Sequence, residues 1–135
     1  MDYEFLALKA AEVKQNAYAP YSNFHVGAAL LTEDGKIYTG VNVETSSYGL
    51  TMCAERTAAF KAISEGERKF TALALASDDP EFCPPCGACR QVLWDLCGDI
   101  DIVFINHKNE IMVKKLSELI PLAFGDERLK KLENK

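Results

Sequence analysis

The sequence predicts an α/β domain in which helices cover a sheet. Short apolar runs alternate along the chain with longer segments of helix-forming residues, and this alternation is typical of helices that pack on a sheet. The chain has 135 residues, 48% of them hydrophobic, which suffices for one core but not for two. It contains no internal repeat, low-complexity tract or linker. We therefore expect residues 1–135 to form a single domain.

The first predicted elements are a helix and a hairpin. Residues 2–17 carry apolar side chains near helical spacing, and the pattern ends before Pro20, which cannot continue a helix. The apolar runs 26–31 and 37–43 flank a loop at 33–36 that contains an Asp-Gly pair. Because Asp-Gly suits positive backbone φ in a tight turn, these runs are predicted to be antiparallel strands.

The rest of the chain continues the alternation. Two helix-forming segments each end at a glycine, where a left-handed C-terminal cap is expected, and each precedes a buried strand. The predicted elements are a helix at 53–65 ended by Gly66, a strand at 70–77, a helix at 86–96 ended by Gly98, strands at 102–105 and near 111–113, and short helices around Pro121.

Charge and apolar patterning exclude two classes of partner. The chain has 15 basic and 20 acidic residues, a net charge of -5, and non-specific nucleic-acid binding depends on clustered basic residues. No apolar run approaches the roughly 18 residues needed to cross a bilayer, and the N-terminus lacks the features of a signal peptide. We expect a cytoplasmic protein with neither nucleic acid nor membrane as partner.

Cysteine is the residue type that points to chemistry. Thiols in a reducing compartment seldom pair as disulfides, so five cysteines in a chain with no export signal indicate metal binding or redox chemistry. The odd number also argues against a complete set of intramolecular disulfides. The five are Cys53, Cys83, Cys86, Cys89 and Cys97.

A CxxC pair at the start of a predicted helix is the strongest local signal. Such a pair can be a redox dithiol, two zinc ligands or a coincidence. Cys83 and Cys86 form an overlapping second CxxC, but Cys83 precedes two prolines and is expected in irregular chain. Cys86 and Cys89 lie three apart on one helical face, near the positive end of the helix dipole, which favours thiolates. Helix geometry therefore selects Cys86 and Cys89.

Cys53 opens another predicted helix, so two helix starts can converge on one ion. Three protein ligands leave the fourth tetrahedral position of zinc open for water, which is the arrangement of a catalytic site. Glu55 is close enough to move protons between such a water and a substrate. Arg56 and Arg90 are candidates to hydrogen-bond the thiolates and draw charge off the metal. The residues thus predict a small zinc hydrolase.

Five stretches of the chain together resemble the small cytidine deaminases that act on free nucleosides. Cys53-Ala54-Glu55, followed about thirty residues later by Pro85-Cys86-Gly87-Ala88-Cys89, looks like the [HC]xE…PCxxC signature of zinc-dependent nucleobase deaminases. The stretches follow the order and spacing of the family and span nearly the whole chain. They are 18–24, 26–30, 40–44, 53–58 and 85–91.

The resemblance implies a three-layer α-β-α sandwich with a mixed five-stranded sheet and one Zn²⁺ per subunit. It also implies hydrolytic deamination of cytidine and 2'-deoxycytidine to uridine and 2'-deoxyuridine, with release of ammonia, in pyrimidine salvage. In this reaction Glu55 takes a proton from water, protonates N3 of the ring and carries a proton to the departing amine.

The same resemblance assigns substrate contacts and an assembly. Asn42 and Glu44 match the family's NxE motif that hydrogen-bonds the ribose, and on a strand they project to one face. Phe24 matches the aromatic that packs on the pyrimidine, and Ala54 the residue whose backbone contacts the base. The remaining matches imply a homotetramer with pockets shared between subunits. They are Tyr48 and Phe124, at positions that complete a neighbouring subunit's pocket.

Two other interpretations remain open at this stage. Four cysteine ligands, including Cys83, would make a structural zinc site. A related enzyme could deaminate another aminopyrimidine, such as a nucleoside antibiotic or a base within a polynucleotide. The family's metal site has no place for Cys83 or Cys97, and the two histidines, His25 and His107, are predicted to be structural.

Overall fold

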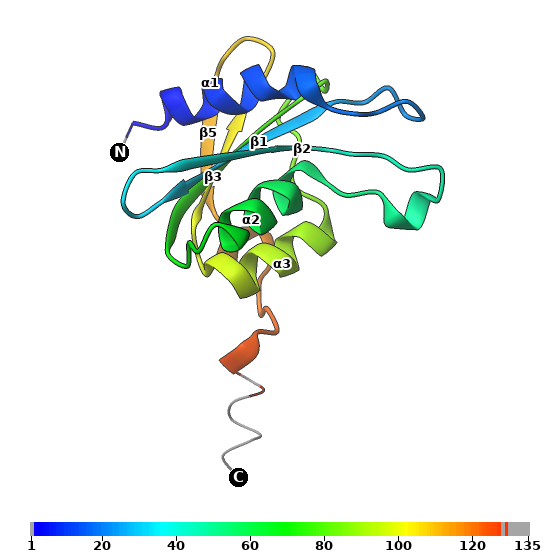
Figure 1. The fold of residues 1–135 in the computed structure, drawn as a ribbon. Coiled ribbons are helices and arrows are strands. Elements are labelled where there is room, and N and C mark those ends of the chain that lie inside the picture. The colour runs from blue at the N-terminus through cyan, green and yellow to red at the C-terminus, as the bar shows by residue number, and fades with distance from the viewer. Residues whose placement is uncertain (1, 128, 130–135) are drawn as a thin grey trace.

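A computed structural model, which describes residues 2–127 and 129, shows three layers. Helix α1 (Glu4–Val13) covers one face of a five-stranded sheet, and α2 (Ala54–Ser64) and α3 (Gly87–Cys97) cover the other (Figure 1). This confirms the predicted α-β-α sandwich. Within the described residues, no helix has both the length and the apolar character to cross a membrane.

The sheet is mixed. Its strand order is β2-β1-β3-β4-β5, and β3 and β4 run parallel while every other neighbouring pair is antiparallel. The parallel pair needs a crossover, which α3 provides. The strands are β1 (Val26–Thr32), β2 (Ile37–Val41), β3 (Phe70–Ser77), β4 (Asp101–Ile105) and β5 (Ile111–Lys115).

Both faces of the central strands are buried, which explains why these strands read as continuous apolar runs. Ala28 and Leu30 of β1 pack into the core beneath α2 and α3. Ala29 and Leu31, which alternate with them, pack into the core beneath α1. The alternating side chains of one strand therefore hold both helical layers.

Tight turns end the elements where glycine was expected. In the hairpin between β1 and β2, Thr32 O accepts from Gly35 N at 3.1 Å, and Gly35 has φ 91°. Gly66 and Gly98 follow α2 and α3 with φ values of 96° and 77°. Positive φ at these three positions is the conformation that glycine adopts without steric cost.

Two boundaries differ from the sequence prediction. The first helix was predicted to extend to residue 17, but α1 ends at Val13 and continues as a 3₁₀ turn, Lys14–Asn16, a tightening that is common at helix ends. The second strand was predicted to reach residue 43, but β2 ends at Val41. Beyond it, Val43 forms isolated bridges with Tyr18 and Met52. Because Val43 pairs with these residues outside the sheet, the chain leaves the sheet after Val41.

The remaining short elements lie near the ends of these layers. A 3₁₀ turn precedes α2, and a single-turn helix follows β5 just before Pro121, where short helices were predicted. The two are η2 (Tyr48–Leu50) and α4 (Leu116–Leu119).

A glycine in β2 lets α2 lie directly on the sheet. A Cβ at Gly40 would lie 2.4 Å from Ala58 N and 2.5 Å from Ala54 O, both backbone atoms of α2. We expect Gly40→Ala to reduce the free energy of unfolding by about 3 kcal/mol, since backbone cannot yield as a side chain can. Urea denaturation measures this. Gly49→Ala is the matched control because its Cβ would meet no atom within 4 Å; an equal loss in both variants would contradict the packing argument.

Candidate metal centre and active site

Two helix N-termini bring three cysteine sulfurs together. Cys53 is the N-cap of α2 and Cys86 the N-cap of α3, with Cys89 in the first turn of α3. The Sγ atoms of Cys86 and Cys89 lie 3.3 Å apart, and those of Cys53 and Cys86 lie 4.0 Å apart. All three sulfurs lie within 4.8 Å of one another.

This spacing fits a zinc ion. Tetrahedral zinc with Zn–S bonds of about 2.3 Å holds its sulfurs about 3.8 Å apart. The Cys86–Cys89 and Cys53–Cys86 separations, 3.3 and 4.0 Å, lie on either side of that value. Within residues 2–127 and 129, no other group of three or more histidine, cysteine or acidic side chains comes together in this way. The three cysteines are therefore positioned to bind a metal ion.

Charge around the sulfurs favours a thiolate at Cys53. A hydrogen bond with Cys89, together with one from Arg56 Nη2 at 3.2 Å, lowers the pKa of Cys53 to about 5. The same hydrogen bond, with burial, raises the pKa of Cys89. Cys89 thus keeps its proton until a cation replaces it, as expected of a thiol ligand.

Arg90 does not contact the thiolates, contrary to the sequence prediction. Its Nε donates to Pro85 O at 2.8 Å and its Nη1 to Leu119 O at 2.7 Å. Helical side chains point back toward the helix N-terminus, so Arg90 reaches the loop before α3 and the end of α4. It ties these two segments together, whereas Arg56 is the arginine that lies at the sulfurs.

Glu55 is a buried carboxyl beside the metal ligands. It lies in the first turn of α2 with 5% of its surface exposed. Burial raises the pKa of Glu55, and the nearby Cys53 raises it further. A buried acid with a perturbed pKa in a cavity is typical of a proton-transfer group.

Glu55 and two of the cysteines border one cavity of about 240 Å³. Cys83 lines the same cavity but lies outside the sulfur group. Several residues that line this cavity were not predicted from the sequence. Among them are Leu75 and Ser77 at the carboxyl end of β3, where α/β proteins commonly bind ligands. The lining residues are Phe24, Val26, Asn42, Thr51, Met52, Cys53, Ala54, Glu55, Leu75, Ser77, Cys83, Pro84 and Cys86.

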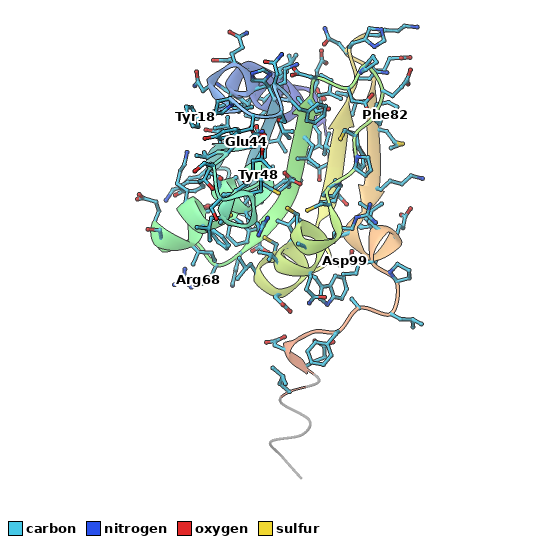
Figure 2. All side chains as sticks on the ribbon, turned by 90° about the vertical axis from the view of Figure 1, so that its right-hand side faces the viewer. Tyr18, Glu44, Tyr48, Arg68, Phe82 and Asp99 are labelled. Atoms are coloured by element: carbon cyan, nitrogen blue, oxygen red, sulfur yellow. The ribbon has the colours of Figure 1, made fainter. Side chains whose placement is uncertain are left out.

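A second cavity, of about 410 Å³, shares Thr51 with the first. It is lined by Tyr21, Ser22, Glu44, Tyr48 and Thr51. Figure 2 shows Glu44 and Tyr48 close together on the same side of the molecule, and the Tyr48 ring lies edge-on to Tyr21 with centroids 5.8 Å apart. The two cavities form a site with a metal end and an aromatic end.

Comparison with known proteins identifies this arrangement. The family model for the cytidine and deoxycytidylate deaminase zinc-binding region matches residues 1–106. The chain belongs to this family. A cytidine deaminase of Halalkalibacterium halodurans is 49% identical over 128 residues, covering 94% of this chain and 97% of the relative. One of Sporosarcina psychrophila is 48% identical over 130 residues, covering 96% of each.

A solved structure agrees with the deaminase fold as well. The crystal structure of cytidine deaminase from Burkholderia pseudomallei matches with a TM-score of 0.87 and 45% identity, and the match covers 92% of this chain and all of that one. The deaminase family model is a zinc-binding one, in agreement with the cysteine cluster. The chain is a zinc-binding deaminase domain.

Asn42 and Glu44, which the deaminase resemblance predicts to contact the ribose, also hydrogen-bond the backbone of segments that line the two cavities. Asn42 is 9% exposed; its Oδ1 accepts from Val26 N at 2.9 Å and its Nδ2 donates to Phe24 O at 2.8 Å. Glu44 accepts from Tyr21 N at 3.0 Å and from the backbone and hydroxyl of Ser22. The Ser22 hydrogen bond keeps the pKa of Glu44 below its ordinary value. Both residues lie beyond the end of β2, not within a strand as predicted.

The other residues predicted to contact substrate lie in three different places. Phe24 and Ala54 line the first cavity and Tyr48 lines the second. Phe124 borders neither cavity and is 56% exposed, with its carbonyl accepting from Gln91 Nε2 at 2.7 Å. Within a single chain, the structure therefore brings all of these residues but Phe124 to the site.

Zinc content distinguishes the three-cysteine site from a four-cysteine one. Cys89→Ser should lose most of the metal because a hydroxyl is a poor zinc ligand, while Cys83→Ser should keep about one zinc per chain. Atomic absorption on purified protein measures both. If Cys83→Ser loses its zinc while remaining folded, the structural four-cysteine interpretation replaces this one.

Proposed function

We propose that this protein deaminates cytidine and 2'-deoxycytidine to uridine and 2'-deoxyuridine, with release of ammonia, as a step of pyrimidine salvage. The observation that carries the proposal is the buried Glu55 in a cavity bordered by Cys53 and Cys86 of the sulfur cluster. The named relatives, cytidine deaminases at 48–49% identity over nearly the full length, support the substrate.

Glu55 performs the proton transfers. The three cysteines would hold a zinc ion, which when bound would supply the Lewis acidity that makes water a usable nucleophile at neutral pH. Glu55 accepts the proton of the attacking water, donates it to N3 of the pyrimidine and then carries the second proton to the amine that leaves C4. A carboxyl group with a raised pKa suits both the acceptance of a proton from water and its donation to the substrate, since such a group holds a proton and releases it at little cost. Arg56 stabilises the Cys53 thiolate throughout.

The cavity walls are suited to a neutral nucleoside. Phe24 packs on the pyrimidine and the backbone of Ala54 contacts it, while Asn42 and Glu44 hydrogen-bond the ribose. Among the described residues that line the two cavities there are carboxylates but no lysine or arginine, so a phosphate finds no cationic partner. Together with the net charge of -5, this disfavours nucleotides and polynucleotides.

Loss of the Glu55 carboxylate should abolish most of the activity. We expect Glu55→Gln to lower kcat on cytidine by about 10³- to 10⁴-fold, because general acid–base transfer contributes that much, with zinc content unchanged. The fall in ultraviolet absorbance as uridine forms measures the rate. Glu65→Gln, at the exposed far end of α2, is the matched control and should retain wild-type activity.

The wild-type assay also tests the substrate. Removal of zinc with a chelator should abolish deamination, and zinc addition should restore it. A folded, zinc-loaded wild type that converts no free cytidine, but deaminates another aminopyrimidine nucleoside, would replace the proposed substrate. Inactivity on every aminopyrimidine would refute the proposed chemistry altogether.

We further propose that the protein is a homotetramer whose pockets are shared between subunits. Large apolar side chains are exposed on two projecting segments: Tyr48 is 74% and Leu50 71% exposed around η2, and Phe124 is 56% exposed after α4. Figure 1 shows both segments extending from the body of the domain. Exposed apolar residues on projecting segments indicate contact with another chain.

A complementation experiment tests the shared pocket. Subunits with Glu55→Gln lack the proton-transfer group, and subunits with Phe124→Ala lack the group donated to a neighbour. Mixed assemblies should regain roughly a quarter of wild-type activity by random assortment, with a mass four times the 15.0 kDa chain. If subunit exchange is verified but activity stays at the sum of the two variants, the pockets are not shared.

A cytoplasmic location completes the proposal. All five cysteines are free, and the three of the sulfur cluster must remain thiols or thiolates to bind a metal. A reducing compartment keeps them in that state.

A further inference from the structure

Three consecutive amides in the wall of the first cavity donate to side chains. Phe24 N donates to Ser22 Oγ at 3.1 Å and Val26 N to Asn42 Oδ1 at 2.9 Å. Between them, His25 N donates to Asp78 Oδ2 at 2.8 Å. Phe24 and Val26 line the cavity, so the position of this wall depends on three side-chain acceptors. Of these, Ser22 and Asn42 themselves line the two cavities, whereas Asp78 lines neither.

Asp78 is the centre of a cluster outside the cavities. Its Oδ2 also accepts from His25 Nδ1 at 2.6 Å, and its Oδ1 lies 3.3 Å from Lys14 Nζ. Its own amide donates to His25 O at 3.1 Å. Burial raises the pKa of Asp78, but hydrogen bonds from His25 and Lys14 outweigh burial and leave it below its ordinary value. The carboxylate therefore joins the 3₁₀ turn after α1, the end of β3 and the segment that enters β1.

We propose that Asp78 is a positioning residue that holds the Phe24–Val26 wall against the substrate. This inference rests on the proposed function, in which Phe24 packs on the pyrimidine. Asp78 follows Ser77, which lines the same cavity, so one carboxylate sets the relative position of two wall segments. Glu55 and the cysteines of the cluster lie in α2 and α3 or at their N-caps, whereas Asp78 follows β3 and binds His25 and Lys14. Loss of Asp78 should therefore weaken substrate binding and leave the chemical step intact.

Asp101 provides a matched control. It accepts from Tyr3 OH at 2.6 Å and pairs with Lys115 Nζ at 2.9 Å, so it too combines a hydrogen bond with an ion pair. Asp101 begins β4, whereas Asp78 follows the end of the parallel strand β3. The two aspartates thus lie at opposite ends of the sheet, and Asp101 lines neither cavity.

Steady-state kinetics on cytidine test the inference. For Asp78→Ala we expect KM to rise about tenfold, the loss of roughly one charge-assisted hydrogen bond, with kcat within about twofold and zinc content unchanged. Asp78→Asn should show a smaller rise, because its amide oxygen can still accept from His25 N. Asp101→Ala should lose stability but keep the wild-type KM. Hydrogen exchange at the His25 amide should accelerate in Asp78→Ala alone.

Each other outcome has a definite meaning. An unchanged KM in Asp78→Ala, or an equal rise in Asp101→Ala, overturns the positioning role. A loss of zinc or of kcat that parallels the rise in KM also overturns it, because Asp78 would then support the cysteine cluster and Glu55 and not the Phe24–Val26 wall. If Asp78→Ala does not fold, Asp78→Asn decides by the same criteria. Failure of the wild type to convert cytidine would instead refute the proposed function, and this inference with it.

Discussion

The site depends on two helices that begin at the same point on one face of the sheet. The N-caps of α2 and α3 are both cysteines, and a thiolate at a helix N-terminus is stabilised by the unpaired amides there. Three sulfurs held within 4.8 Å of one another cannot all be ionised without a cation between them. A zinc ion bound by these sulfurs would therefore join the two helices as well as supply chemistry. The contact of α2 with Gly40 matters for the same reason, because a displaced α2 would carry Cys53 away from its partners.

What makes the metal centre catalytic is the cavity beside it. Cys53 and Cys86 form part of the cavity wall, so a ligand in the cavity can reach the metal. A fourth cysteine ligand would close that side. Cys83 has the spacing for this, yet it faces the cavity from outside the sulfur group, and burial raises the pKa of its thiol. The structure thus places the first cysteine of the overlapping CxxC outside the sulfur group.

Local patterns predicted much of this molecule. The strand 70–77 was predicted with both of its ends, and the helices that carry the cysteines within about a residue, because glycines and helix caps are local signals. Non-local contacts could not be predicted in this way. The apolar run 37–43 suggested a strand through residue 43, but Val43 pairs with Tyr18 and Met52. Arg90 was placed at the thiolates because it follows Cys89, although the carbonyls that it binds meet it only in the folded chain.

Under the proposed function the polar residues of the wall have two tasks, to hold the backbone of the wall and to contact the sugar, which changes how their substitution must be interpreted. The Glu44 side chain hydrogen-bonds backbone amides before residue 23, and the Asn42 side chain hydrogen-bonds backbone atoms after it. Asn23 itself has a positive φ of 55°. Residues 21–24 lie outside the strands, and these side chains help to hold them in place. Removing either residue would leave backbone amides without these side-chain acceptors as well as losing the proposed contact to the sugar, so its cost would exceed that of one hydrogen bond. Asp78 lacks the second task, and therefore its substitution reports on the position of the wall alone.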